Sequence, residues 1–157
     1  MSYQIYSSEI NNPTLSVLLA PGAKMPRRAH HTDAGADLYA LFAEPDNLDQ
    51  RIELEPGKQI LVDTGVSIKI PTGYAGFLHA RSSQRSKGIT CWGTGIIDSG
   101  FRGSLKVVLS NQSTTNYVIT PNMAIAQLVI QPVALCSFAD IWNDADRGTG
   151  GFGSTNK

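Results

Sequence analysis

Short apolar runs, broken every few residues by turn-forming residues, constrain the fold of this chain more than any other feature. Val66, Ile68 and Ile70 alternate with polar residues, as in a strand that buries one face. Further runs rich in β-branched and apolar residues cover 15–19, 59–62, 74–79, 105–109, 116–119 and 126–133. The turn sequences Pro56-Gly57, Asp63-Thr64-Gly65 and Pro71-Thr72-Gly73 lie between runs. Because no long stretch has helical periodicity, we predict an all-β barrel or sandwich.

The chain divides into a long β-rich part and a short glycine-rich end. Its 157 residues suit one domain, and glycine becomes frequent after Asp144. We therefore predict a β domain over residues 1–143 and a flexible C-terminal arm over residues 144–157. The acidic stretch 43–50 is typical of a surface loop between strands.

Charge and composition exclude several classes of function. Thirteen basic residues balance thirteen acidic ones, so the chain is a poor candidate for binding long nucleic acid. A single nucleotide needs only a few local cations. No apolar run approaches the length of a membrane span, and residues 1–4 lack the features of a secretory signal. We expect a cytoplasmic protein that binds no membrane, with Cys91 and Cys136 as free thiols.

The C-terminal arm carries the first candidate binding site. Gly148, Gly150 and Gly153 match the dinucleotide pattern G-x-G-x-x-G, but that fold needs a strand before the glycines and a helix after them. Bare backbone N–H groups and the Arg147 guanidinium can nevertheless wrap a phosphate, and Phe152 offers a flat face to a base. A disordered tail is the alternative, which this mixture of side chains disfavours.

Three internal segments could also carry chemistry. Arg81-Ser82-Ser83 at a strand end could clamp an oxyanion, although it could also be a solvent-facing turn. Asp98, among glycines, could orient and deprotonate a water, or belong to a hairpin turn. Asp37, in a strand of small residues, needs a cation or metal if it points inward, and a structural ion pair would also satisfy it. His30, His31 and His79 have no zinc-ligand spacing.

Five ordered motifs together resemble the trimeric dUTPase family over nearly the whole chain. They are Ala34-Gly35-Ala36-Asp37-Leu38; Ala80-Arg81-Ser82-Ser83, preceded by Pro71-x-Gly73-x-x-Gly76; Gly95-Ile96-Ile97-Asp98-x-x-Phe101-Arg102-Gly103; Ala126-Gln127-Leu128; and Arg147-Gly148-x-Gly150-Gly151-Phe152-Gly153-Ser154-Thr155. The resemblance implies a distorted jelly-roll β-barrel with a flexible C-terminal arm. It also implies a homotrimer whose active sites are shared between subunits.

The resemblance further implies hydrolysis of dUTP to dUMP and pyrophosphate with Mg²⁺, in the cytoplasm or, for a viral protein, the host cytoplasm. This activity would keep uracil out of DNA and supply dUMP for thymidylate synthesis. Asp98 would activate the water that attacks the α-phosphorus, and Asp37 would hold a water on Mg²⁺. The triphosphate would be bound by Arg81, Ser82, Ser83, Gln127, Arg147, Gly153, Ser154 and Thr155. Uracil and deoxyribose would be bound by Trp92, Gly95, Ile96, Ile97, Phe101, Lys106 and Phe152.

Two residues depart from the family pattern near the base and sugar. Phe101 replaces the usual tyrosine, so the ring can pack on the deoxyribose without the phenol's hydrogen bond. Trp92 stands where many relatives have asparagine, which leaves more of the uracil readout to backbone groups.

Two alternative functions are compatible with this scaffold. A dCTP deaminase needs a glutamate on the strand after the third motif, where this chain has Val108, and an apolar residue cannot shuttle protons. A non-catalytic binding module could use the acidic 43–50 loop to dock a partner, but it predicts a degraded site, whereas Asp98, Arg81 and the arm are all present.

Overall fold

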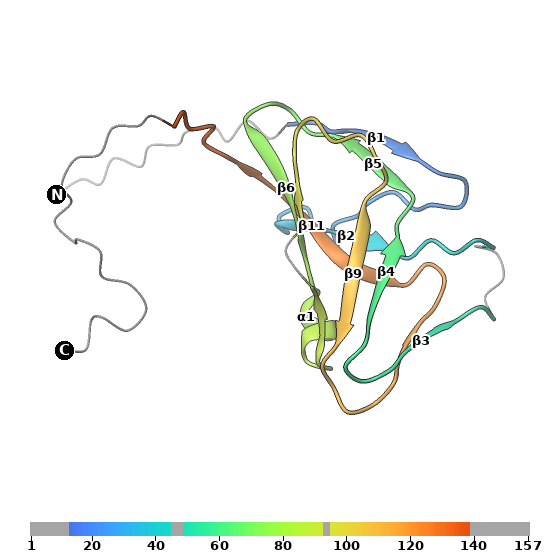
Figure 1. Cartoon of the computed structure of the whole chain (residues 1–157). Coiled ribbons are helices and arrows are strands. Elements are labelled where there is room, and N and C mark those ends of the chain that lie inside the picture. Colours follow the sequence, from blue (N-terminus) through green and yellow to red (C-terminus); the bar gives the residue numbers. More distant parts are fainter. Residues whose placement is uncertain (1–12, 45–48, 93–94, 139–157) are drawn as a thin grey trace, which may run out of the picture.

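The computed structural model describes residues 13–44, 49–92 and 95–138 (Figure 1). The regular secondary structure in these residues is almost entirely β, with one short helix. The elements are β1 (Ser16–Leu19), β2 (Gly35–Tyr39), β3 (Ile52–Leu54), β4 (Gln59–Asp63), β5 (Val66–Lys69), β6 (Tyr74–His79), α1 (Ser82–Arg85), β7 (Ile89–Cys91), β8 (Ile96–Ile97), β9 (Lys106–Asn111), β10 (Tyr117–Ile119) and β11 (Ala124–Pro132). The helix in the described residues is far too short and polar to cross a membrane.

The strands pair antiparallel in four sheets. The largest has the order β2-β11-β6-β8, the next β4-β9-β7, and two small sheets pair β1 with β5 and β10 with β3. Neighbours in space are therefore far apart in the chain, as in a jelly roll. Within the described residues the sheets do not close into a single barrel, because hydrogen bonding stops at short edge strands such as β8.

One hydrophobic core lies between the sheets and follows the alternation of the sequence. On β5, Val66 and Ile68 are buried while Lys69 is exposed, and on β9 Val107 and Leu109 are buried. Side chains from all four sheets meet in this core, including Leu38, Leu54, Val66, Leu105, Leu109, Ile119 and Ile125. The core fixes the four-stranded sheet, whose other face carries polar groups.

The predicted strands are confirmed with small shifts of their ends, and β6 has the predicted bounds, Tyr74–His79. The three predicted turns connect β3 to β4, β4 to β5 and β5 to β6. The sequence did not predict β3, β7, β8 or α1, which have three, three, two and four residues. Elements this short have too few residues to show a periodicity. Cys91 and Cys136 are free thiols, as expected.

Candidate active site

A row of three polar side chains crosses the middle of the large sheet. Gln127 on β11 lies directly opposite Asp37 on β2 and directly opposite His79 on β6. Residues paired across antiparallel strands project from the same face, so Asp37, Gln127 and His79 share one face. Because the buried Leu38 and Leu128 belong to the opposite face, the polar row points away from the core.

Gly35 leaves the space that the Gln127 side chain occupies. A Cβ at Gly35 would lie 3.1 Å from Gln127 Cβ and 3.2 Å from its Cδ and Oε1. These contacts are tighter than most Cβ contacts, so any larger residue would push the amide away. Gly35 of the first motif is therefore needed to leave room for Gln127 of the fourth motif.

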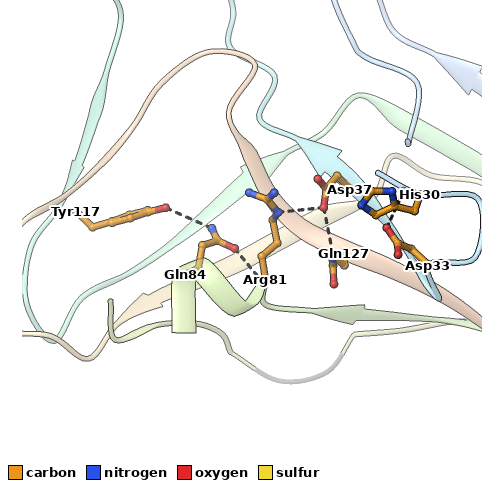
Figure 2. A network of polar contacts seen from close by, with 7 residues as sticks. All are labelled: His30, Asp33, Asp37, Arg81, Gln84, Tyr117 and Gln127. Atoms are coloured by element: carbon orange, nitrogen blue, oxygen red, sulfur yellow. Dashed lines mark hydrogen bonds and ion pairs between the residues drawn. The ribbon is translucent and has the colours of Figure 1, made fainter. Parts of the chain in front are cut away.

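The sheet places Asp37, Arg81 and Gln127 in direct contact (Figure 2). Arg81 Nε donates to Asp37 Oδ1 at 3.0 Å, and Gln127 Nε2 donates to the same oxygen at 3.3 Å. The Asp37 side chain is 16% exposed and that of Arg81 32%. The alternative of a structural ion pair for Asp37 is thus correct, and its partner is itself a predicted site residue. The salt bridge joins Arg81 Nε to Asp37 Oδ1, and the two terminal guanidinium nitrogens are not part of it.

Arg81, Ser82 and Ser83 lie where β6 passes into the single turn of α1. Arg81 is the N-cap residue with an extended backbone, and its carbonyl accepts the Gln84 and Arg85 N–H groups. Ser82 and Ser83 are exposed. A shallow pocket of about 360 Å³ opens beside them, lined by Gly35, His79, Ser82, Arg85 and Gln127 among others. A larger cavity of about 910 Å³ lies elsewhere, between β1 and β11, and contains no predicted site residue.

Asp98 lies on a tightly closed loop between β8 and β9. The Phe101 N–H donates to the Asp98 carbonyl at 3.0 Å, and Arg102 Nη1 donates to the carbonyls of Ser99 at 2.7 Å and Phe101 at 2.6 Å. The Phe101 ring lies over Gly103, where a Cβ would meet its Cζ at 2.7 Å. The turn alternative for Asp98 is therefore correct, but β8 and β9 pair with other strands and not with each other in the described residues, so the hairpin is not found. The loop also presents Asp98 and Phe101 to solvent.

The predicted base-reading residues lie on β8 and on the segments on either side of it. The Gly95 carbonyl accepts the Leu78 N–H at 3.3 Å, which ties the start of β8 to β6. Ile96 and Trp92 are 61% and 57% exposed, whereas Ile97 packs against the core. Trp92 is thus a surface residue, and its backbone N–H donates to the Val108 carbonyl at 2.9 Å.

Asp63 joins the end of the Asp98 loop to β4, a role that the sequence did not indicate. Its Oδ1 accepts the Ser104 hydroxyl and the Gly65 N–H, and its Oδ2 lies 3.6 Å from Lys106 Nζ. Burial alone would raise the pKa of Asp63, but the two hydrogen bonds and the charge of Lys106 together lower it. Lys106 therefore has an acidic partner on the neighbouring strand.

The two groups of site residues lie at opposite ends of β6. Ile97 pairs with Gly76 in an antiparallel register, so the next residue, Asp98, lies beside Ala75. Ala75 precedes Arg81 by six residues. At about 3.3 Å per residue this spacing is roughly 20 Å. Figure 1 shows α1 at one end of β6 and the loop leading into β9 near the other end. One chain therefore does not bring Asp98 to Arg81.

Two functional candidates, His79 and Gln84, were missed or given no role from the sequence. His79 has no zinc-ligand spacing in the sequence, so it gave no signal of a site. The strand register that aligns it with Gln127 is not visible in one sequence. Gln84 is 2% exposed, and a polar residue within a short turn gives no signal of burial. The arm residues Arg147, Phe152, Gly153, Ser154 and Thr155 lie outside the described residues.

The residues present suit a magnesium ion held mainly by a substrate. In the described ranges no group of three or more His, Cys, Asp or Glu side chains could cage a metal. Mg²⁺ commonly keeps several waters and binds phosphate oxygens with one or two carboxylates. In the described chain, both side-chain hydrogen bonds of Asp37 are accepted by Oδ1. Oδ2 is therefore left for such a water.

Comparisons with known proteins agree over most of the chain. The family model for dUTPase matches residues 22–156. A deoxyuridine 5'-triphosphate nucleotidohydrolase from Clostridium tetani is 38% identical, covering 89% of this chain and 94% of that protein. The corresponding protein from Thermobifida fusca is 41% identical, covering 87% of this chain and 75% of that protein.

Solved structures share the fold. A mutant of the dUTPase of phage 80alpha has a TM-score of 0.75 and 31% identity, covering 90% of this chain and 98% of that one. The dUTPase of phage phi11 of S. aureus has a TM-score of 0.73 and 28% identity, covering 85% and 99%. With its five motifs, its jelly-roll topology and these matches, the chain belongs to the dUTPase family.

Proposed function

We propose that this protein hydrolyses dUTP to dUMP and pyrophosphate. The observation that carries the proposal is the contact of Asp37, Arg81 and Gln127, three residues from separate motifs on one exposed face. A guanidinium, an amide and two serine hydroxyls form a suitable donor set for a chain of phosphates. The names of the relatives support deoxyuridine triphosphate as the substrate, and a phage 80alpha dUTPase has been solved with dUpNHpp.

In the proposed mechanism, Arg81, Ser82, Ser83 and Gln127 hold the triphosphate. Phosphoryl transfer needs positioning and neutralisation of charge more than covalent help. Asp37 keeps the Nε edge of Arg81 fixed, so the terminal nitrogens of the guanidinium face outward to phosphate oxygens. The bound chain then presents its α-phosphorus to a water.

Asp98 is the proposed general base. Its carboxylate takes a proton from the water as the water oxygen bonds to the α-phosphorus. The bond from that phosphorus to the bridging oxygen breaks, and pyrophosphate leaves with the electron pair. The loop contacts made by Arg102 hold Asp98 in place for this step.

Magnesium is the proposed cofactor, and Asp37 would hold it through a water. When bound, Mg²⁺ neutralises negative charge on the phosphate oxygens. A structure of the phi11 dUTPase is described as showing a structural Mg(II) ion. Within this chain, Asp37 contributes the carboxylate and Arg81 keeps it oriented.

We propose a homotrimer, as the family resemblance implies, and the distance between the two ends of β6 supports active sites that are shared between copies of the chain. A carboxylate roughly 20 Å from the phosphate-binding turn cannot act on a water there. A second copy that presents its Asp98 loop to the Arg81 end of the first would complete the site. We propose that the C-terminal arm closes on it from a neighbouring subunit, with Phe152 over uracil and Arg147, Gly153, Ser154 and Thr155 on phosphates.

The predicted base-reading residues around β8 and at the start of β9 are the proposed readers of uracil and deoxyribose, with Trp92 beside them. Gly95, Ile96, Ile97 and Lys106 would contribute backbone groups, while the exposed Phe101 ring packs on the sugar and excludes a 2′-hydroxyl. Selective removal of dUTP would keep uracil out of DNA and supply dUMP for thymidylate synthesis.

Asp98→Asn tests this mechanism. The amide keeps the size of the side chain but cannot accept the proton, so kcat should fall by roughly 10²–10⁴-fold. Binding of dUTP, measured by calorimetry, should persist. Asp33→Asn, a change on the separate turn before β2, serves as the control. Near-normal turnover by Asp98→Asn would reject Asp98 as the base.

A further inference from the structure

Gln84 is a buried polar residue directly beneath the phosphate-binding turn. It belongs to α1, is only 2% exposed, and lies between Arg81 and Tyr117 (Figure 2). Its Oε1 accepts the Arg81 backbone N–H at 3.2 Å, and its Nε2 donates to the Tyr117 hydroxyl at 3.5 Å. The one amide therefore joins α1 to β10.

Packing alone does not account for a buried amide at the position of Gln84. Burying an amide costs free energy unless hydrogen bonds replace those it made with water. An apolar side chain of similar size would fill the space without that cost. The amide offers an acceptor for the Arg81 N–H and a donor for Tyr117, and no apolar residue offers either.

The turn carrying Arg81, Ser82 and Ser83 has little stability of its own. Helix α1 is a single turn of four residues, and short helices are not stable in isolation. Among the described residues, two polar side-chain contacts tie the turn to other parts of the fold. Asp37 fixes the Arg81 side chain from the large sheet, and Gln84 reaches β10, which pairs with β3 in a different sheet.

We propose that Gln84 is a positioning residue that fixes the phosphate-binding turn by linking the Arg81 backbone to Tyr117. This inference rests on the proposed function, because it assigns the turn to the phosphates of the substrate. With the amide in place, the Ser82 and Ser83 groups and the Arg81 backbone keep one geometry before substrate arrives. Such preorganisation matters because small displacements of positioning groups reduce catalysis strongly.

The experiment compares Gln84→Leu, which removes both hydrogen bonds, with Tyr117→Phe, which removes only the hydroxyl. Gln59→Leu, on an exposed position of β4, is the matched control. Steady-state kinetics with dUTP, calorimetry with dUpNHpp and with dUMP, and thermal melting are measured for each. We expect kcat/KM for Gln84→Leu to fall roughly 10–100-fold, with a smaller fall for Tyr117→Phe and none for Gln59→Leu.

The affinities for the two ligands distinguish a positioning role of Gln84 from a role in stability alone. Affinity for dUpNHpp should fall more than affinity for dUMP, because dUMP lacks the outer phosphates. A Gln84→Leu protein with a lowered melting temperature but unchanged kcat/KM and unchanged dUpNHpp affinity would overturn the proposal. If Gln84→Leu does not fold, unchanged kinetics and binding in Tyr117→Phe would overturn it as well.

The same experiment distinguishes failure of this inference from failure of the proposed function. If the wild-type protein binds dUpNHpp but releases no pyrophosphate from dUTP, the proposed hydrolysis is wrong, and the dUpNHpp affinities still decide the role of Gln84. If the wild-type protein binds neither dUpNHpp nor dUTP, both proposals are wrong.

Discussion

At the residue scale, the central contact is one carboxylate oxygen shared by two donors. Asp37 Oδ1 accepts from Arg81 at 3.0 Å and from Gln127 at 3.3 Å. The sequence showed these residues as members of three separate motifs, and the strand register brings them together. A partly buried carboxylate with two donors has a fixed orientation, which suits the proposed role of holding a water on Mg²⁺.

The ionisation of Asp63 should affect the stability of the folded protein. Its pKa is lowered in the folded protein by Ser104, Gly65 and Lys106, which together outweigh burial. The folded state therefore binds this proton less readily than the unfolded state. The resulting stabilisation is fully present above the unfolded pKa of about 4, and it is lost as the pH falls through the lower folded pKa.

Asp63→Asn should remove this pH dependence. At pH 7 the variant should lose roughly 1 kcal/mol or less of unfolding free energy, since the side chain is 38% exposed and solvent screens its charge. Below about pH 4 the difference from wild type should shrink. Urea denaturation at several pH values measures this, with the exposed Glu55→Gln as control. A difference that grows with acidification would contradict the assignment.

At the element scale, the loop between β8 and β9 depends on a close packing contact. A Cβ at Gly103 would lie 2.7 Å from Phe101 Cζ, so Gly103→Ala must displace the ring. The displaced ring should admit a 2′-hydroxyl, and discrimination between dUTP and UTP should fall roughly tenfold.

Gly100→Ala is the matched control for this loop. A Cβ there would meet nothing within 4 Å, so selectivity should not change. The ratio of kcat/KM for the two nucleotides is the measurement. If both alanine variants keep the wild-type ratio, Phe101 does not set sugar selectivity.

Some elements of this fold can be predicted from the sequence and others cannot. Strands such as β6 were predictable, because alternation and flanking turns specify them locally. Helix α1 was not, because four residues show no period. Its side-chain contacts reach residues distant in the chain: Arg81 contacts Asp37, and Gln84 contacts Tyr117, 33 residues away. The candidate site residues were predicted from their motifs and stay predictions, but the roughly 20 Å between Asp98 and Arg81 follows from pairing register, which one sequence does not reveal.

At the scale of the whole molecule, the proposed mechanism requires more than one copy of the chain. The proposed phosphate-binding turn and the proposed base lie at opposite ends of β6, so in this proposal each chain contributes to two different sites. The C-terminal arm, residues 144–157, lies outside the described residues, and its proposed role rests on its sequence alone.

Deletion of the residues after Asp146 tests the role of the arm. Removing Arg147, Phe152 and the hydroxyl donors should lower kcat/KM for dUTP roughly 100-fold or more, because the donors and the cover over the base are lost together. Sedimentation should remain that of the full-length protein. Full activity in the truncated protein would exclude the closing arm.

The most direct measurement is product release from a panel of nucleoside triphosphates with Mg²⁺. Wild-type protein is incubated with dUTP, dCTP, dTTP and UTP, and both pyrophosphate and ammonia are assayed. We predict pyrophosphate from dUTP far in excess of the other three, and no ammonia from dCTP. Ammonia from dCTP, or the absence of pyrophosphate from dUTP, would contradict the proposed function.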